Sequence, residues 1–518
     1  MENQSDHKPW IKTVDPVLFP PTLKDNTADT DRFAKGIQKH LDHSAIHIDL
    51  SLVKNLPHIL RECNYEVTAV LFEEQGGWTL IDVLPTAGKA GPYGLAVDLG
   101  TSTVVVSLIN LSDSTTTDTL SFSNPQIEVG TDILTRIHAA TQKGGLEALR
   151  GLLCEELNRR IEELALKNHI HPHDIMGMAL AGNTTMTHLF LGLDPYWICR
   201  EPYIPVANRF EIQSASDLDL SIHPRSPVFI FPNVGSYFGG DLIAGILASG
   251  MTHDSDTSLL VDVGTNAEVV IGSSDWLMAC AGAAGPALEG GVAEMGMMAG
   301  PGAIDQVRID PVTYDFNVKT IEGQRPIGIC GSGMIDLVAQ LFLAGMIDLR
   351  GRYVPSTCGD LLFEVNGIKH LMVVPSKDSG TGRSLSLSQT DIDGLIRSKA
   401  AMYTILTTIT NTVNIPFDQI RRFYVAGTFG TYISPRSAIT IGMIPDLPLE
   451  TFVPLGNTSL AGARMALLSS QSREEVSRIR DQVTYMELNV NQEFMNLFSA
   501  AKFIPHTDRS LFPSVQHK

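Results

Sequence analysis

Two stretches, far apart in the chain, carry the residue types that phosphate chemistry requires. Each is an apolar strand ending in an aspartate, then a Gly-Thr turn and a second β-branched strand: 95–106, with Asp98, Gly100, Thr101, Ser102 and Thr103, and 259–271, with Asp262, Gly264, Thr265 and Asn266. Glycine lets a phosphate approach the backbone, and successive N–H groups and hydroxyls bind its oxygens. The aspartates repel phosphate but can hold the water shell of a bound Mg²⁺.

Either stretch alone is also typical of an ordinary β-hairpin. Because the pattern occurs twice, it predicts two similar halves that present their turns to a shared cleft. A triphosphate held between two such turns, with two aspartates toward its metal, makes a physically sensible ATP site. The pair of stretches therefore predicts that ATP and Mg²⁺ bind this chain.

A third carboxylate, Asp241, follows Gly239 and Gly240 at the expected start of a helix that runs through Ala248. There it could orient the water that attacks a phosphoryl group, a task that needs a positioned acceptor more than a strong base. The alternative is an acid that stabilises the helix N-terminus through the backbone dipole.

Further glycine turns could bring backbone close to a ligand. They are 280–291, which contains Gly285, then 329–336, and 423–430, which contains Gly427, Thr428 and Gly430. The last follows a buried strand and could support adenosine, and Lys399 on a long helix could reach the ribose or the adenine edge. The alternatives are tight packing between layers for the first two turns and a solvated helix position for Lys399.

Hydrophobic periodicity supplies the elements that position these residues. We expect an irregular N-terminal arm over 1–50, a small helix-hairpin domain and linker over 51–92, a first half over 93–255, a second half over 256–470, and a C-terminal helix and tail over 471–518. Expected elements include strands at 117–123, 175–181, 228–231 and 368–374, and helices at 132–141, 145–168 and 391–412.

Composition limits the classes of function. The 518 residues are 43% hydrophobic and 18% charged, as in folded multidomain proteins, and the net charge of −19 argues against nucleic acid or an anionic membrane as partner. We find no transmembrane run or signal peptide and expect a cytoplasmic protein. The six cysteines form no closely spaced cluster motif, so we expect free thiols, with Cys280 and Cys330 as small buried residues.

The three glycine turns resemble the two phosphate motifs and the adenosine motif of the actin, Hsp70 and sugar-kinase superfamily. This resemblance implies an α/β fold with two actin-like (ribonuclease H-like) halves around a nucleotide cleft, plus a small N-terminal α/β unit. A narrower resemblance covers residues 51–506. The stretches that carry it are 93–101, 124–126, 130–133, 181–189, 239–241, 280–291, 328–333 and 425–430. They resemble the reductive activators of corrinoid proteins, ATPases that drive the reduction of cob(II)alamin to cob(I).

The resemblance implies a corrinoid protein as partner, with the corrinoid on that partner. Family members usually carry a [2Fe–2S] domain with four closely spaced cysteines, whereas no cysteine precedes Ser51 here. We therefore expect no iron–sulfur cluster and a separate electron donor, a ferredoxin or a flavoprotein. Ala267 and Thr428 add bulk where the family has smaller residues, which could weaken nucleotide binding. A homodimer is left open.

Three other functions remain as alternatives. One is a corrinoid- or nucleotide-binding protein with little ATP turnover. A second is a small-molecule kinase of the same superfamily, with its substrate pocket near Asp241. A third, an activator of a radical dehydratase, would need cysteines that bridge a dimer, and the cysteine spacing gives it no support.

Overall fold

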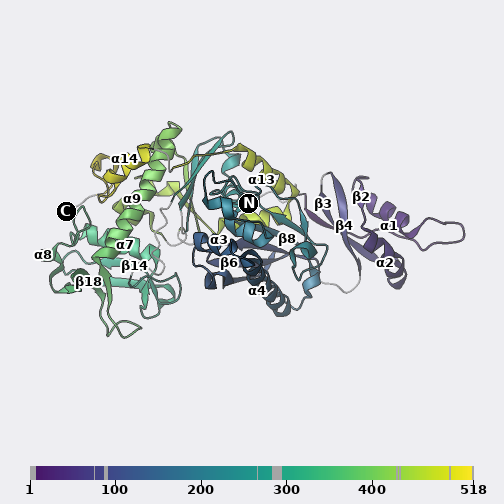
Figure 1. Ribbon diagram of the computed structural model, residues 1–518, viewed down its shortest axis with the longest axis horizontal. Helices are drawn as coiled ribbons and strands as arrows, with labels where there is room; N and C mark the ends of the chain where they lie inside the picture. Colours follow the sequence, from purple (N-terminus) through teal and green to yellow (C-terminus); the bar gives the residue numbers. More distant parts are fainter. Residues whose placement is uncertain are drawn as a thin grey trace. The chain divides into compact units, whose positions relative to one another are not determined.

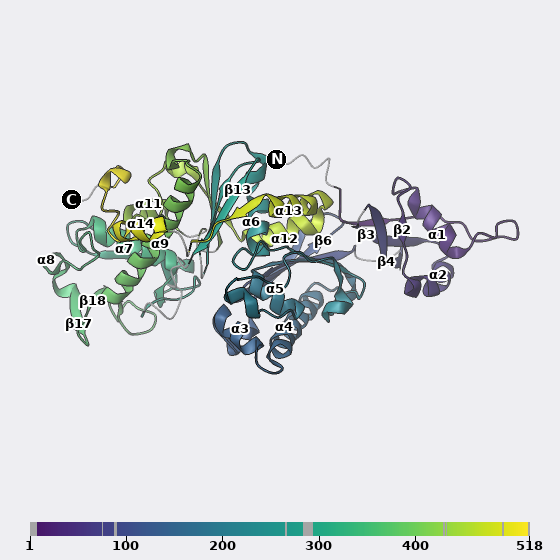
Figure 2. The ribbon, with the colours of Figure 1, turned by 45° about the horizontal axis from the view of Figure 1, so that its top comes forward.

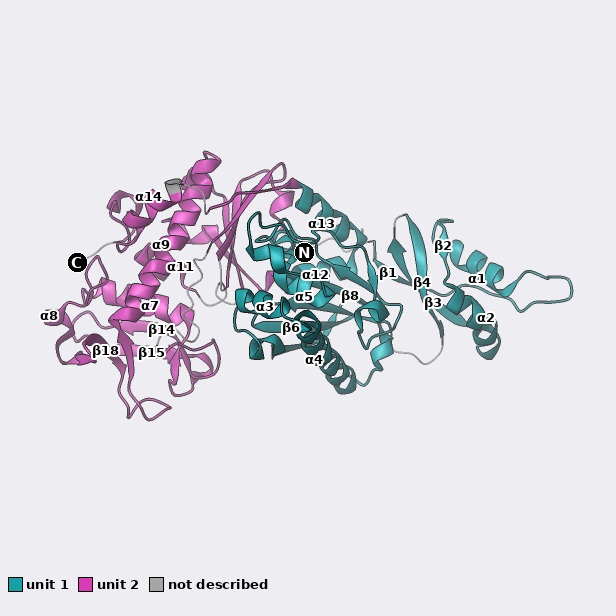
Figure 3. Ribbon diagram, viewed as in Figure 1, with its two compact units in different colours: residues 1–248, 459–481 teal, residues 249–458, 482–518 magenta. Residues whose placement is uncertain are grey.

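The structure is a computed structural model that describes residues 8–74, 76–86, 91–264, 267–282, 294–427, 430, 433–488 and 492–515. The chain divides into two compact units (Figure 3). The first comprises residues 1–248 and 459–481, and the second comprises 249–458 and 482–518. The division falls a few residues before the expected end of the first half. No helix in the described part combines the length and apolar content needed to cross a bilayer.

The first unit begins with a four-stranded sheet in the order β1-β3-β4-β2. Its elements are β1 (Ile11–Val14), α1 (Asp29–Gln38), β2 (Ile46–His47), α2 (Leu50–Glu62), β3 (Val67–Glu74) and β4 (Gly77–Pro85). The expected helix-hairpin core at 51–92 is therefore present, and α1 and α2 lie beside the strands (Figure 1).

The expectation that 1–50 is an irregular arm is wrong for its described residues. Strand β1 pairs antiparallel with β3, and Phe33 and Ile37 of α1 are fully buried with Leu56 of α2. The segments are short, and Pro16, Pro20 and Pro21 separate them. Their order depends on pairing with strands that come later in the chain, which local periodicity does not reveal.

The main sheet of the first unit has the order β7-β6-β5-β8-β10-β9. Its strands are β5 (Tyr93–Leu99), β6 (Thr103–Asn110), β7 (Thr116–Ser123), β8 (Ile175–Gly182), β9 (Gln213–Ser214) and β10 (Pro227–Ile230). Strands β5, β6 and β7 are antiparallel neighbours, whereas β5, β8 and β10 run parallel.

Helices cover both faces of this sheet. They are α3 (Ile133–Ala140), α4 (Gly145–Lys167), α5 (Thr184–Leu191), α6 (Gly240–Ser249), α12 (Thr458–Leu468) and α13 (Ser470–Gln482). Figure 2 shows α3, α4 and α5 on one side, with α6, α12 and α13 on the other. Leu149, Leu153, Leu157 and Ile161 of α4 are buried in the core, as their helical spacing predicts.

The main sheet of the second unit has the order β21-β20-β11-β12-β13-β22. Its strands are β11 (Ser258–Val263), β12 (Ala267–Gly272), β13 (Leu277–Gly282), β20 (Arg422–Ala426), β21 (Phe452–Gly456) and β22 (Val483–Tyr485). Strands β11, β12 and β13 are antiparallel neighbours, and β11, β20 and β21 are parallel. Without the edge strands β9 and β22, both sheets have the strand order 3-2-1-4-5 along the chain, and the α/β fold with two similar halves is confirmed.

A large insertion separates β13 from β20. It contains β14 (Ala303–Ile309), β15 (Phe316–Thr320), β16 (Gly328–Ile329), α7 (Gly331–Leu343), α8 (Pro355–Cys358), β17 (Leu362–Val365), β18 (Ile368–Val374), β19 (Leu385–Ser388) and α9 (Gln389–Thr412). Two three-stranded sheets, β15-β14-β16 and β17-β18-β19, lie within it. Helices α11 (Pro435–Ile441) and α14 (Gln492–Ala501) complete this unit. One continuous apolar core joins the insertion to β11 and β12.

Candidate functional site

The turn between β5 and β6 is held in place by Asn124. The Nδ2 of this fully buried side chain donates to the backbone oxygen of Gly100 (3.0 Å), and its backbone N–H donates to the oxygen of Ser102 (2.9 Å). Its Oδ1 accepts from the backbone N–H of Gln126 and so caps the 3₁₀ turn η1 (Pro125–Glu128). The first predicted phosphate turn is therefore held by a buried asparagine, which donates hydrogen bonds to two backbone oxygens of the turn.

A second asparagine links the same turn to a helix N-terminus. Asn183 is the N-cap of α5, where its Oδ1 accepts from the backbone N–H of Met186 (3.0 Å). Its Nδ2 donates to Oγ1 of Thr101 (3.0 Å). A helix N-terminus favours anions through its free N–H groups and its dipole, so α5 adds to the phosphate-binding character of the turn.

Asp241 lies beside the same group. A Cβ placed on Gly239 would come 2.5 Å from Cα of Asn183 and 2.6 Å from Oδ1 of Asp241, so only glycine permits this approach. The hydroxyl of Thr184, at the start of α5, donates to the backbone oxygen of Gly235 (3.0 Å) and ties the preceding loop to the helix. The first unit therefore brings Thr101 and Asp241 close to Asn183.

Behind this group lies Arg136 of α3, which is fully buried. Its Nε donates to the backbone oxygen of Gly130 (2.8 Å), and its Nη1 lies 3.4 Å from Oε1 of Gln126 and 3.2 Å from Sδ of Met186. Burial lowers the pKa of Arg136 to about 10, so the guanidinium remains charged at neutral pH. It joins the loop that carries Asn124 to the first turn of α5.

Asp98 occupies the second-last position of β5, directly before the turn. It pairs in register with Val105 of β6 and Ala181 of β8, and its side chain is half-buried. Thr101 and Thr103 are likewise half-buried, whereas Ser102 is exposed. These positions leave the carboxylate at the carboxyl end of the sheet, where open α/β sheets bind ligands.

The second unit repeats the aspartate at the corresponding place. Asp262 stands one residue from the end of β11, in register with Glu268 and Ala426. Gly427, which follows β20, has a φ of +80°, and a Cβ there would come 3.1 Å from Oδ1 of Asp262. Asp262 and Gly427, the start of the predicted adenosine turn, are thus neighbours at the carboxyl ends of the adjacent strands β11 and β20.

Several predicted residues cannot be placed. Four of them, Thr265, Asn266, Gly285 and Thr428, lie outside the described residues. Of the remaining glycines, Gly264 is exposed with open space around it, and Gly430 is buried close to Val425. Ala267 is fully buried in the apolar core, so its methyl group packs against that core.

Lys399 was expected to reach the nucleotide or to be solvated, and both interpretations are wrong. Its side chain is fully buried, and Nζ donates to the backbone oxygens of Phe503 (2.5 Å) and Pro505 (2.6 Å). Burial holds the pKa of Lys399 well below its usual value. The amino group of Lys399 is bonded to the C-terminal segment, which follows it by about a hundred residues, so local sequence gave no signal of this partner.

No role was predicted for Arg136, nor for Asn124 and Asn183, which lie within stretches that carry the family resemblance. Their positions just after a strand end, in Asn-Pro and Gly-Asn-Thr sequences typical of caps and turns, were an available signal. Nothing in the local sequence distinguishes Arg136 from an exposed helical arginine.

The cysteines behave as expected. All six are free thiols, and Cys280 and Cys330 are buried. Burial raises the pKa of Cys280 far above the ordinary thiol value, so it is a poor nucleophile. Among the described residues no group of three His, Cys, Asp or Glu side chains could hold a metal directly.

Three family models match the chain in succession. The model described as the RACo linker region matches residues 2–89, the RACo middle region matches 93–254, and the C-terminal domain of RACo, the ASKHA domain, matches 256–516. Together they span nearly every described residue.

Individual relatives agree with these models. The corrinoid activation enzyme RamQ of Eubacterium limosum is 30% identical over 486 residues, which is 91% of this chain and 79% of that protein. The [Co(II) methylated amine-specific corrinoid protein] reductase of Methanosarcina barkeri is 23% identical over 443 residues, covering 78% and 76%. A solved structure, the reductive activator for corrinoid, iron–sulfur protein, matches with a TM-score of 0.91 and 37% identity, covering 99% of this chain and 82% of that one.

Proposed function

The chain belongs to the RACo family, the reductive activators of corrinoid proteins, and from this premise we propose that it is an ATPase that promotes reduction of cob(II) to cob(I) on a corrinoid protein. The observation that carries the ATP-dependent part is the convergence of Thr101, Asn183 and Asp241 in the first unit. A hydroxyl turn, a helix N-terminus and a carboxylate are the parts that phosphate binding and hydrolysis require.

Each residue has a proposed task. Backbone N–H groups and hydroxyls of 100–103 and 264–266 bind phosphate oxygens, and Asp98 and Asp262 hold the water shell of Mg²⁺. Asp241 accepts a hydrogen bond from the attacking water and so orients the water toward the terminal phosphate. Gly427–Gly430 supports adenosine. When bound, Mg²⁺ supplies positive charge that offsets the charge developing on the phosphates.

The redox step needs one electron for each cobalt, and ATP hydrolysis to ADP and phosphate supplies none. We propose that the electron comes from a separate ferredoxin or flavoprotein, because the chain's cysteines form no closely spaced group. ATP binding and hydrolysis reshape the corrinoid protein and displace a cobalt ligand. Loss of that ligand raises the reduction potential of the cob(II) state, and the electron transfer becomes downhill.

The test is reduction of a cob(II) corrinoid protein with ATP, a chemical reductant and this chain, followed by the visible spectrum of the corrinoid. Asp262→Ala is expected to slow ATP-dependent reduction by about 100-fold or more, as removal of a transition-state contact does. The matched control is Asp256→Ala, which removes an exposed aspartate of the same unit. Circular dichroism establishes that both variants remain folded.

Two outcomes would contradict the proposal. Full activity of Asp262→Ala would remove this carboxylate from the mechanism. ATP binding without phosphate release, with or without the corrinoid protein, would favour the nucleotide-binding alternative.

A further inference from the structure

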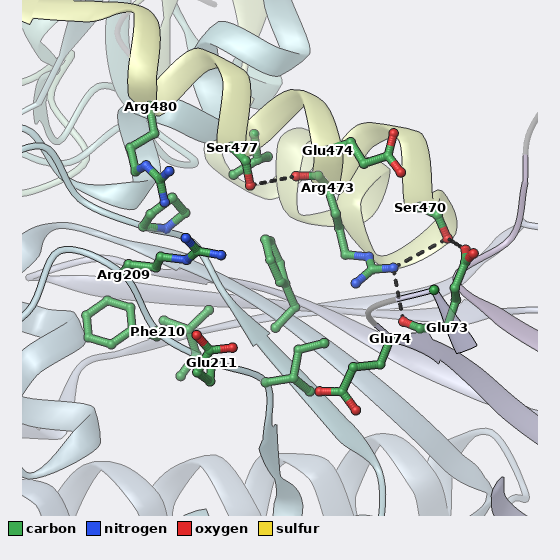
Figure 4. Close-up of a pocket in the computed structure, with 16 residues that line it drawn as sticks. Glu73, Glu74, Arg209, Phe210, Glu211, Ser470, Arg473, Glu474, Ser477 and Arg480 are labelled. Carbon is green, nitrogen blue, oxygen red and sulfur yellow. Dashed lines mark hydrogen bonds between the residues drawn. The ribbon is translucent and has the colours of Figure 1, made fainter. Parts of the chain in front are cut away.

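A cavity of about 300 Å³ lies within the first unit and shares no lining residue with the candidate site. Three segments enclose it: the end of β3 with its following turn, the stretch 209–212, and helix α13 (Figure 4). Phe229 and Ile230 of β10 complete the lining. The cavity therefore lies where the small N-terminal sheet meets the actin-like part of this unit, and its volume suits a small metabolite.

Arg473 of α13 is the most deeply placed charge in this cavity. Its guanidinium lies 4.5 Å from the ring centroid of Trp10 and 6.0 Å from that of Phe229. Burial lowers its pKa to about 10, so it stays charged at neutral pH. The rings of Trp10 and Phe229 orient the guanidinium and replace part of the hydration that it loses on folding.

The hydrogen bonds of Arg473 are long for a partly buried cation. Its Nη2 reaches the backbone oxygen of Glu73 and the hydroxyl of Ser470, both at the long distance of 3.4 Å, and its buried Nε has no partner within the described residues. The carboxylate of Glu73 is already shared, because it accepts from Lys8 and from the hydroxyl of Ser470 (2.6 Å). The protein alone thus leaves the donors of Arg473 incompletely satisfied, and an oxyanion would complete them.

The rest of the lining carries charges of both signs, with Glu474 on α13 among them. In Figure 4, Arg209 and Arg480 direct their guanidinium groups toward one another, whereas the carboxylates of Glu74 and Glu211 lie on the side away from α13. Arg480 is bonded to Asp481 (2.6 Å). Across the described residues, Arg209, Glu74 and Glu211 make no side-chain hydrogen bond or ion pair, so their charges are available to a ligand.

We propose that this cavity binds a small zwitterion, a molecule with a carboxylate at one end and an ammonium group at the other. The carboxylate accepts hydrogen bonds from Arg473 and Arg209, and the ammonium lies against Glu74 and Glu211, with the apolar chain over Phe229. A dianion would be repelled by Glu74 and Glu211, and a dication would be repelled by Arg209 and Arg473. The bound molecule joins the N-terminal sheet to α13, and this binding does not depend on the proposed ATPase activity.

The experiment is isothermal titration calorimetry of the full chain, without nucleotide or corrinoid, using ligands of equal length and different end charges. The first set is 4-aminobutanoate, succinate and 1,4-diaminobutane, and the second is 6-aminohexanoate, adipate and 1,6-diaminohexane. In at least one set the zwitterion is expected to bind about tenfold more tightly than the dianion and the dication. The proposal is overturned if neither zwitterion binds, or if the dianion binds as tightly.

Variants at the exposed rim locate the binding. Arg209→Gln and Glu211→Gln are each expected to weaken zwitterion binding by about fivefold or more, since each removes one charge-assisted contact. The double variant Glu74→Gln/Glu211→Gln should shift preference toward the dianion of the same length. Arg159→Gln, an exposed change on α4, is the matched control and should leave binding unchanged. Equal binding by Arg209→Gln, Glu211→Gln and the control would overturn the assignment to this cavity.

Discussion

The two actin-like sheets share the order of five strands and differ at the edge strands β9 and β22, and each unit uses its buried basic side chain differently. In the first unit, Arg136 bonds to the loop that braces the β5–β6 turn and lies against Met186 of α5. In the second, Lys399 of α9 bonds to the backbone oxygens of Phe503 and Pro505. Arg136 supports a candidate ligand-binding turn, whereas Lys399 holds the C-terminal segment against α9. A repeated topology therefore does not imply a repeated placement of buried charge.

Both cations are bonded to neutral acceptors, without a carboxylate partner among these bonds. Desolvation lowers the pKa of each, which means that burial costs free energy that the hydrogen bonds offset only in part. Such a contact tolerates little change, because removal of the side chain takes the donor away from buried acceptor oxygens. We therefore predict that replacing either side chain lowers the free energy of unfolding, but that only the replacement of Arg136 weakens ATP binding.

The largest expected effect comes from removing each cation in turn. Arg136→Met and Lys399→Met should each lower the free energy of unfolding by about 2 kcal/mol, since each leaves buried carbonyl oxygens unsatisfied. Hydrogen exchange followed by mass spectrometry should localise the loss to 124–140 and α5 in the first variant, and to α9 and 492–508 in the second. Only Arg136→Met should raise the KM for ATP.

An equal effect of the two variants on the KM for ATP would break this comparison. Lys399→Arg serves as the conservative control, because it keeps hydrogen-bond donors and tests whether the site accepts a larger donor. Loss of exchange protection in the second unit of Arg136→Met, or in the first unit of Lys399→Met, would likewise contradict the assigned contacts.

A smaller effect is expected from Asn183→Ala in the first unit. This change removes an N-cap and the contact to Thr101, and we expect it to cost about 1 kcal/mol of unfolding free energy. ATP affinity, measured by calorimetry, should fall more than the small loss of stability suggests, because the turn loses its tie to α5. Asn183→Asp keeps the cap acceptor and loses the donor to Thr101. Cap variants with unchanged ATP affinity would place phosphate binding elsewhere.

The smallest effect concerns His188 of α5. Its ring is fully buried, with Nδ1 donating to the oxygen of Thr184 (2.7 Å) and Nε2 accepting from the N–H of Ala207 (3.4 Å). Burial lowers its pKa below the ordinary value of 6.5, so the unfolded chain binds the proton more readily. Stability is therefore complete above pH 6.5 and falls as the pH drops below it.

Urea unfolding at pH 7 and pH 5 checks this prediction. His188→Gln should reduce the loss of unfolding free energy between the two pH values, although its stability at pH 7 is lower. The same exchange at exposed His253 is the control. An unchanged pH dependence in His188→Gln would assign the acid sensitivity to other groups.

Much of the fold and part of the candidate site could be predicted from local sequence. Alternating apolar residues gave the β5–β6 and β11–β12 hairpins, and helical spacing gave α4 and α9, because each of these patterns depends on neighbours a few residues apart. The aspartates one residue before the ends of β5 and β11 followed from the same patterns. The pairing of β1 with β3 was missed, since a four-residue strand is stabilised by its partner rather than by its own sequence.

The sequence by itself determined which turns could bind phosphate and which aspartates stand beside them, because a strand, a glycine turn and a carboxylate are adjacent along the chain. The contact of Asn183 with Thr101, the approach of Gly239 to Asn183 and Asp241, the burial of Arg136 and the bonds of Lys399 to the C-terminal segment arise only in the folded protein. These contacts join residues separated by tens to hundreds of positions. Their existence depends on how strands pair and helices pack, which the residue types alone do not specify.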